Sequence, residues 1–241
     1  MSKTLKIALF GATGMIGSRI AAEAARRGHQ VTAFSRNPER APADVANLKA
    51  AQADVTDAAS IAAGARGHDV VASAYAPPQG NLTQIDKATR ALVEGTRAAG
   101  IKRLVVVGGA GSLEVAPGKQ LVDTEGFPPA YKPIALAHRD VLPILRAASD
   151  LDWTFFAPAA LIAPGERKGT FRTGANALIV DAQGNSSISA EDYAIAFVDE
   201  LEQGRFVHQL ATQQIAVGEF FQDVEQDEFC AELLRQECGP R

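Results

Sequence analysis

Apolar runs alternate with helix-forming segments from the start of the chain. Residues 5–10 form an apolar run that ends at Gly11, and helix-forming residues continue over 15–27, where Gly28 closes the segment. A second apolar run covers residues 30–34. The pattern therefore predicts a strand, a tight turn, a helix and a second strand. Strands connected in this way are parallel, and a parallel sheet needs helices on both faces.

The same alternation predicts four more strands and three more helices before residue 159. The strands are expected at residues 48–53, 69–74, 103–107 and 153–156, and the helices at 57–65, 85–99 and 133–148. Pro133 suits the first turn of the last of these helices, where a missing N–H costs nothing. Residues 108–112 are too rich in glycine for regular structure, so we expect them to form a loop at a site.

Beyond Pro158 the pattern changes to short segments separated by glycine. Over residues 159–187 it predicts a small hairpin, formed by 170–173 and 177–180, on the substrate side. Ser189, with Asp192 three residues on, predicts the N-cap of a helix reaching Glu202. A last strand is expected within residues 206–217, and residues 219–241 are expected to form one acidic tail helix. No repeat or flexible linker divides residues 1–241, which predicts a single domain.

Composition narrows the possible partners. Of 241 residues, 46% are hydrophobic and 22% charged, as in ordinary globular domains. The net charge of -4 provides no basic field for a phosphate backbone, so no nucleic-acid partner is expected. No apolar run reaches the ~18 residues of a membrane helix, so we expect a cytoplasmic protein that has no membrane contact. Cys230 and Cys238 are expected to be free thiols, and no metal-ligand spacing occurs.

Three glycines in the first turn point to a dinucleotide. Residues 11–17 read Gly-Ala-Thr-Gly-Met-Ile-Gly, directly after the first strand and at the start of the first helix. Backbone N–H groups and the positive end of the helix dipole converge there, as pyrophosphate binding requires. Glycines needed only for a tight turn would not require this spacing. The sequence thus predicts a Rossmann-type α/β fold, with a doubly wound, mostly parallel sheet. Cofactor contacts are expected from Gly11, Thr13, Gly14, Met15, Ile16 and Gly17.

The end of the second strand predicts NADP(H) as the cofactor. An Asp or Glu there would bind the ribose hydroxyls of NAD, but the strand ends in Ser35 and Arg36, which suit a 2'-phosphate. Arg40 is positioned to add a second contact. The alternative is that both arginines are solvated surface residues. Asp54 and Val55 are expected to flank the adenine ring, although Asp54 also suits a helix N-terminal acid that binds no ligand.

With these motifs and the stretch Asp-Trp-Thr-Phe-Phe-Ala-Pro at 152–158, the chain resembles the atypical short-chain dehydrogenase/reductase superfamily. Within it, the chain is most similar to NAD(P)H-binding proteins of the flavin reductase, biliverdin-IXβ reductase and NmrA-like type. The resemblance covers about residues 5–217 and leaves out the acidic tail. It implies further cofactor contacts at Ala74, Tyr75, Gly109, Pro158 and Ala159, the last two through backbone groups at the nicotinamide amide.

The chain departs from this superfamily at its proton-transfer pair, a Tyr and a Lys four residues later on one helix face. Here Tyr131 is followed at once by Lys132 and Pro133, and the residue four positions on is Ala135. Because a residue before proline disfavours the α-conformation, we expect neither side chain on the helix face over the cofactor. A proton relay through tyrosine is not expected.

By the same resemblance, Ser112 and His138 are the catalytic candidates. His138 would donate a proton near neutral pH, and Ser112 would bond a substrate carbonyl or the carboxamide. The alternative is a histidine packed on loop backbone and a serine that caps the loop.

Three functions fit these features. The first is an NADPH-dependent oxidoreductase that transfers hydride to a flat conjugated acceptor such as a flavin, quinone or tetrapyrrole. The second is a non-catalytic NADP(H)-sensing regulator of NmrA-like type, with the acidic tail as a protein contact. The third, a nucleotide-sugar epimerase or dehydratase, is disfavoured because it needs the Tyr–Lys pair. The sequence does not fix the oligomeric state.

Overall fold

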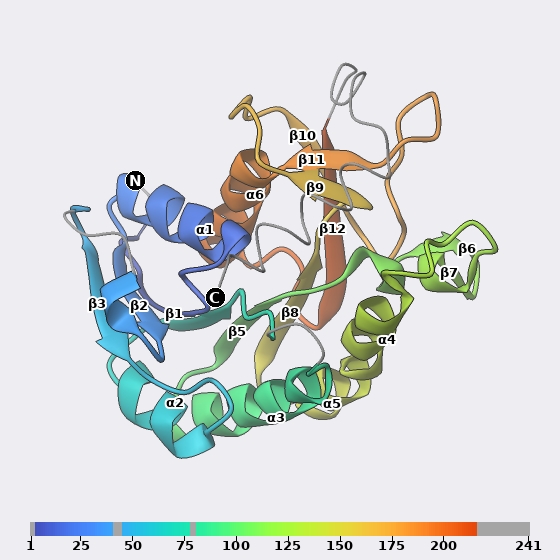
Figure 1. Ribbon diagram of the computed structural model, residues 1–241. Coiled ribbons are helices and arrows are strands. Elements are labelled where there is room, and N and C mark those ends of the chain that lie inside the picture. Colours follow the sequence, from blue (N-terminus) through green and yellow to red (C-terminus); the bar gives the residue numbers. More distant parts are fainter. Residues whose placement is uncertain (1–2, 41–44, 78–80, 216–241) are drawn as a thin grey trace, which may run out of the picture.

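An eight-stranded sheet forms the centre of the protein. The computed structural model describes residues 3–40, 45–77 and 81–215. The strands of the main sheet are β1 (Lys6–Phe10), β2 (Gln30–Ser35), β3 (Leu48–Gln52), β4 (Val70–Ser73), β5 (Arg103–Val107), β8 (Asp152–Ala157), β10 (Phe171–Ala175) and β12 (Gln209–Ile215). Their order is β10-β12-β8-β5-β4-β1-β2-β3 (Figure 1). Every pair is parallel except β10 with β12. The predicted Rossmann-type fold is confirmed.

Helices cover both faces of this sheet, as its parallel strands require. One face carries α1 (Met15–Arg26) and α6 (Ala190–Gln203). The other carries α2 (Ala58–Ala65), α3 (Thr83–Ala98), α4 (Lys132–Asp140) and α5 (Leu142–Ala147) (Figure 1). Each face has its own buried apolar cluster. The sheet is therefore a rigid base, and the loops at its carboxyl edge are held in place from both sides.

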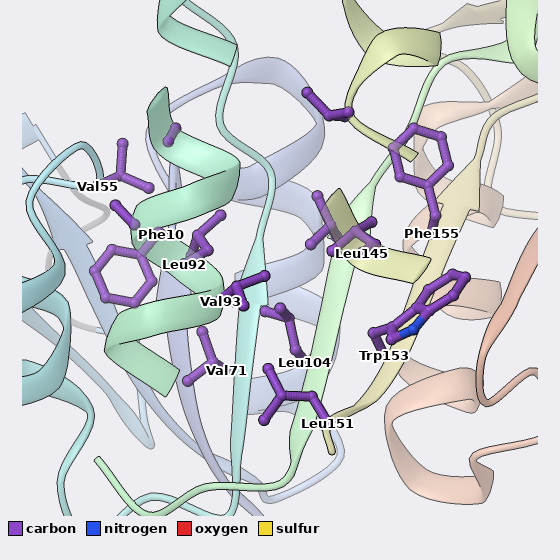
Figure 2. Packing of buried hydrophobic residues seen from close by; sticks show 14 of the residues in the cluster. Phe10, Val55, Val71, Leu92, Val93, Leu104, Leu145, Leu151, Trp153 and Phe155 are labelled. Carbon is purple, nitrogen blue, oxygen red and sulfur yellow. The ribbon is translucent and has the colours of Figure 1, made fainter. Parts of the chain in front are cut away.

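The cluster beneath α3 shows how the sheet is fixed. Phe10, Leu104 and Phe155 project from three different strands toward this face, where Leu92 of α3 and Leu145 of α5 meet them (Figure 2). All five residues are almost completely buried. Burying one such side chain contributes about 1.5–3 kcal/mol. The strands that lead into the loops after β1, β5 and β8 are thus anchored in one core.

Local signals in the sequence set several element boundaries. The hydroxyl of Ser189 accepts a hydrogen bond from the N–H of Asp192 at 3.0 Å, which confirms the predicted N-cap of α6. Asp57 caps α2 in the same way, through the N–H of Ala59. Gly28 follows α1 with φ +86°, a conformation that glycine adopts without strain.

The predicted hairpin of residues 170–173 with 177–180 is wrong. Its first half belongs to β10, which pairs antiparallel with β12 at the edge of the main sheet, and residues 178–180 form no strand. Long-range pairing with the free edge of β12 replaces the local partner. Two short strands also lie in this region, β9 (Leu161–Ala163) and β11 (Ser187–Ser189), and they pair with each other in parallel.

Two further predictions on the α4 side need correction. The single helix expected over 133–148 is divided at Val141 into α4 and α5. Pro143 explains the break, because it has no N–H to donate to the carbonyl four residues earlier. The loop expected at 108–112 contains a 3-10 turn, Ala110–Ser112, and leads into an unpredicted hairpin of β6 (Glu114–Ala116) and β7 (Lys119–Gln120).

The predicted tail helix over 219–241, with Cys230 and Cys238, lies outside the described residues. Within the described ranges, no helix is both long and apolar enough to cross a membrane. The same ranges contain no group of three or more His, Cys, Asp or Glu side chains arranged to hold a metal ion.

Candidate functional site

The strand order reverses between β1 and β4, which are neighbours in the sheet. From β1 the chain continues to β2 and β3 on one side, and from β4 it continues to β5 and β8 on the other. The two connections leave in opposite directions, and in doubly wound folds the ligand-binding crevice lies at the carboxyl ends of the strands at such a reversal point. The glycine turn follows β1 at this point, and Ala74 and Tyr75 follow β4.

Two of the three turn glycines are required by packing. Gly11 has φ +81°, and a Cβ on it would lie 2.7 Å from backbone atoms of Ala74 and Tyr75. A Cβ on Gly17 would overlap the carbonyl oxygen of Gly11. Gly14 differs, because its Cβ would meet only that same oxygen at 3.7 Å. The space beside Gly14 is open, as the approach of a ligand to the backbone requires.

The backbone N–H groups in the first turn of α1 have no acceptor within the helix. Its N-cap, Gly14, has no side chain to accept from them, and the turn contains no acidic residue. The first bond of the helix runs from the N–H of Ser18 to the carbonyl of Gly14. The N–H groups of Met15, Ile16 and Gly17 precede it, at the positive end of the helix dipole. Thr13 and Gly14 are exposed beside them.

The end of β2 presents a hydroxyl and a guanidinium that are both unused. The Ser35 hydroxyl is buried and has no hydrogen-bond partner within the described ranges. Arg36 is exposed, and its guanidinium forms no ion pair or hydrogen bond with any described residue. The side chain of Arg40 lies outside the described part of the structure. Of these two groups, the Arg36 guanidinium is open to a ligand as it stands, whereas the Ser35 hydroxyl would first have to be uncovered.

The adenine-side candidates have different surroundings. Asp54 accepts hydrogen bonds from the N–H and the hydroxyl of Thr56, at 2.9 and 2.8 Å. The N–H of Thr56 lowers the pKa of Asp54, and the positive charges of Arg36 and Lys87 lower it further. Val55 is 92% buried, with its neighbours in the α3-side cluster, so little of it faces a ligand. The Asp54 carboxylate thus stabilises the turn before α2 and also interacts electrostatically with Arg36.

Where the nicotinamide is expected, two glycines bring α4 against the loop after β5. A Cβ on Gly109 would lie 3.0 Å from the Cβ of His138, and one on Gly111 would lie 2.7 Å from the Cβ of Ala135. Ala135 and His138 are three residues apart and so share a helix face. Ser112 is 1% exposed, and its hydroxyl has no hydrogen-bond partner among the described residues. The predicted pair therefore lies on elements in contact, with Ser112 enclosed.

His138 lies in an apolar environment. Its ring is 6.4 Å from the ring of Phe155, centroid to centroid, and it lines a cavity of about 20 Å³ together with Ser73, Tyr75 and Thr89. That volume holds one water molecule. Although part of the residue remains accessible to solvent, burial lowers the pKa of His138 to about 4. The imidazole is therefore uncharged at neutral pH.

The remaining candidates follow β8 and β4 at the carboxyl edge of the sheet. Pro158 and Ala159 follow β8 and are buried, with the Thr212 hydroxyl donating to the Pro158 carbonyl at 3.5 Å. The Tyr75 hydroxyl donates to Gln84 of α3 at 2.8 Å. Sequence reasoning missed Gln84, Ser73 and Thr89, which carry no motif and meet the site through the packing of α3.

One expectation about the missing Tyr–Lys pair is wrong in detail. Lys132 is the first residue of α4 rather than lying before the helix, because proline is tolerated in a first turn. Its side chain is exposed. The residue four positions after Tyr131 is Ala135, which packs against Gly111 and has no amine to offer.

The family model described as NAD(P)H-binding matches residues 11–204. The chain belongs to this NAD(P)H-binding family. The match begins at the first turn glycine and ends at the end of α6, so it includes the whole crevice. The predicted membership of the atypical short-chain dehydrogenase/reductase superfamily is confirmed.

Individual relatives agree with this assignment. The uncharacterized protein YwnB of Bacillus subtilis is 40% identical over 82% of this chain and 92% of its own length. A solved structure of a proposed exported protein from Burkholderia pseudomallei is 70% identical, covers 88% of this chain and all of its own, and has a TM-score of 0.82. A proposed NADH-flavin reductase from Streptococcus pneumoniae is 32% identical, over 88% of this chain and 99% of its own, with a TM-score of 0.79. The cytoplasmic location stays a prediction.

The geometry of the crevice fits a nicotinamide dinucleotide. The uncapped start of α1 and the open side of Gly14 suit a pyrophosphate. Ser35 ends β2, the strand whose carboxyl end binds the adenosine ribose of such a cofactor in this fold. Both features are left unused by the contacts of the described residues.

We expect the substitution Gly14→Val to abolish cofactor binding while the fold survives. The branched side chain would occupy the open space that a pyrophosphate needs, yet it meets only ordinary contacts in the protein. Titration with NADPH, followed by nicotinamide fluorescence, measures binding, and the thermal unfolding midpoint reports on the fold. Gly17→Val is the matched control, and its clash with the Gly11 carbonyl should lower the midpoint. Unchanged NADPH binding by Gly14→Val would mean that the turn is purely structural.

Proposed function

We propose that this protein is an NADPH-dependent reductase that transfers hydride to a small, flat, conjugated acceptor such as a flavin or quinone. The cofactor preference is supported by the end of β2, which offers the Ser35 hydroxyl and the free Arg36 guanidinium but no carboxylate. A guanidinium binds phosphate through paired, charge-assisted hydrogen bonds. A 2'-phosphate would therefore gain contacts that the ribose hydroxyls of NADH would not.

The choice of acceptor rests on the apolar environment of His138, whose ring packs against Phe155 and lines a small cavity. With its pKa lowered to about 4, the imidazole carries no ready proton at neutral pH. The Ser112 hydroxyl is enclosed and has no basic partner among the described residues. Reduction of a carbonyl needs a donor for the developing alkoxide, whereas a flavin or quinone can take its proton from water. The site therefore suits an acceptor that mainly needs to be held in position.

Bound NADPH would supply the hydride, and the residues of this chain would orient it. The first turn of α1 would bind the pyrophosphate, and Ser35 and Arg36 the 2'-phosphate. Backbone groups of Pro158 and Ala159 would hold the carboxamide. Gly109, with His138 packed on it, would bound the space in which the acceptor lies.

A second function is favoured by the same lack of a charged donor. A protein that senses NADP(H) and changes its affinity for a partner needs the cofactor site but no proton donor. Assays of NADPH oxidation with a panel of flavins and quinones separate the two functions. Turnover with any of these acceptors supports the reductase, and tight NADPH binding without turnover supports the sensor. An epimerase or dehydratase is not proposed, because Ala135 stands where its lysine would be needed.

We expect the protein to bind NADPH more tightly than NADH, and Arg36→Ala to narrow the difference. One charge-assisted contact to phosphate contributes about 1.5–3 kcal/mol. Titration calorimetry with both nucleotides provides the comparison. Arg66→Ala is the control, since Arg66 is exposed at the far end of α2 and should leave both affinities unchanged. Equal affinities for NADPH and NADH in the unmutated protein would contradict the cofactor assignment.

We expect His138→Ala to lower turnover with a flavin or quinone by less than about tenfold, because the uncharged imidazole is not the proton donor. Removal of a true proton donor typically lowers turnover by about 10²–10⁴-fold. The imidazole would be protonated only below a pH of about 4, so its charge should not affect the pH–rate profile between pH 6 and 8. His138→Phe is the control for lost packing against Gly109, since it keeps a ring. A loss beyond about a hundredfold in both variants, with the loss of a limb near pH 6.5, would indicate a carbonyl substrate.

A further inference from the structure

Residues 164–170, here named the strap, connect β9 to β10 and are held by the first turn of α6. The N–H of Gly165 donates to Oε2 of Glu191 at 2.8 Å, and the N–H of Gly169 donates to Oδ1 of Asp192 at 2.8 Å. Every residue of the strap is exposed, so these contacts replace the burial that orders most segments. The backbone of the strap is thus fixed by side chains of another element.

A second attachment ties the strap to α1. The Arg167 guanidinium donates to both carboxylate oxygens of Glu23, at 3.1 and 3.2 Å. Burial acts to raise the pKa of Glu23, but hydrogen bonds from three arginines outweigh it and lower the pKa to about 2. Glu23 therefore stays ionised throughout the physiological pH range. The strap bridges the two helices on this face of the sheet.

Glu191 also reaches the glycine turn. Its other oxygen, Oε1, accepts from Nε of Arg19 at 2.5 Å, and Nη1 of Arg19 donates to the carbonyl of Met15 at 2.8 Å. The side chains of Arg19 and Glu191 are about three-quarters buried, which strengthens the pair relative to an exposed one. Met15 is the first residue of α1. A continuous chain of hydrogen bonds thus runs from the turn to Gly165.

The strap lies close in sequence to the nicotinamide end of the crevice. Pro158 and Ala159 lead into β9, and β9 leads directly into the strap. We propose that Glu191, by bridging Arg19 and Gly165, is a positioning residue that sets the distance between the glycine turn and residues 158–163. It would thereby determine how the nicotinamide half of the cofactor is held. This inference rests on the proposed placement of the carboxamide at Pro158 and Ala159, but not on the identity of the acceptor.

The variant Glu191→Gln tests the bridge. Arg19 and the Gly165 N–H reach different oxygens of Glu191, so a glutamine would keep an oxygen for one donor and place its NH2 group, itself a donor, against the other. We expect the affinity for NADPH to fall about tenfold, the effect of losing one charged hydrogen bond. The affinity for adenosine 2',5'-bisphosphate, which lacks the nicotinamide half, should stay unchanged. Amide hydrogen exchange in the strap should become faster, a change that a loss confined to the adenosine end would not produce.

Glu166→Gln is the matched control, because it makes the same change in the strap itself at a side chain that is 80% exposed. It should leave both affinities unchanged. Arg19→Gln removes the other half of the bridge, so the double variant should bind NADPH no more weakly than Glu191→Gln alone. An unchanged NADPH affinity in Glu191→Gln, an equal loss for both ligands, or additive losses in the double variant would overturn the proposal. If Glu191→Gln fails to fold, Arg19→Gln provides the same two-ligand comparison. Neither readout requires turnover, so absence of reductase activity would not affect the result.

Discussion

The close approach of α1 to the end of β1 is the constraint on which the site depends. At Gly17 the helix passes so near the Gly11 carbonyl that no Cβ fits, and at Gly11 the chain is also too near the backbone after β4 for a Cβ. These two contacts bring the start of α1 to the crevice between β1 and β4. They leave Gly14, between them, with open space. The same turn thus serves the packing of the fold and presents free N–H groups to a ligand.

Much of this arrangement could be predicted from the sequence, because it depends on local pattern. Alternating apolar runs predict the parallel strands and their helices, and the three-residue spacing of Ser189 and Asp192 predicts the N-cap of α6. The glycine turn and the absence of an acid at the end of β2 follow from a few adjacent residues. Such signals are local because the backbone conformations and helix ends that they describe are themselves local.

The features that could not be predicted arise from contacts between distant segments. The strand β10 pairs with β12, about forty residues later, instead of forming a local hairpin. The low pKa of His138 arises from its packing among Phe155, Gly109 and α3, which the helix sequence does not reveal. The bridge from Arg19 through Glu191 to Gly165 combines three separate segments without any motif. Substrate-side features in this fold are thus set by tertiary structure, whereas the cofactor turn is set by sequence.

The central claim is that the crevice between β1 and β4 binds NADP(H) with its 2'-phosphate at the end of β2. A crystal structure of the complex with NADP⁺ tests this claim most directly. The account predicts the pyrophosphate at the N–H groups of Met15, Ile16 and Gly17, and the 2'-phosphate within hydrogen-bond distance of Ser35 and Arg36. A nucleotide bound in the reverse orientation, or a 2'-phosphate that contacts neither Ser35 nor Arg36, would contradict it.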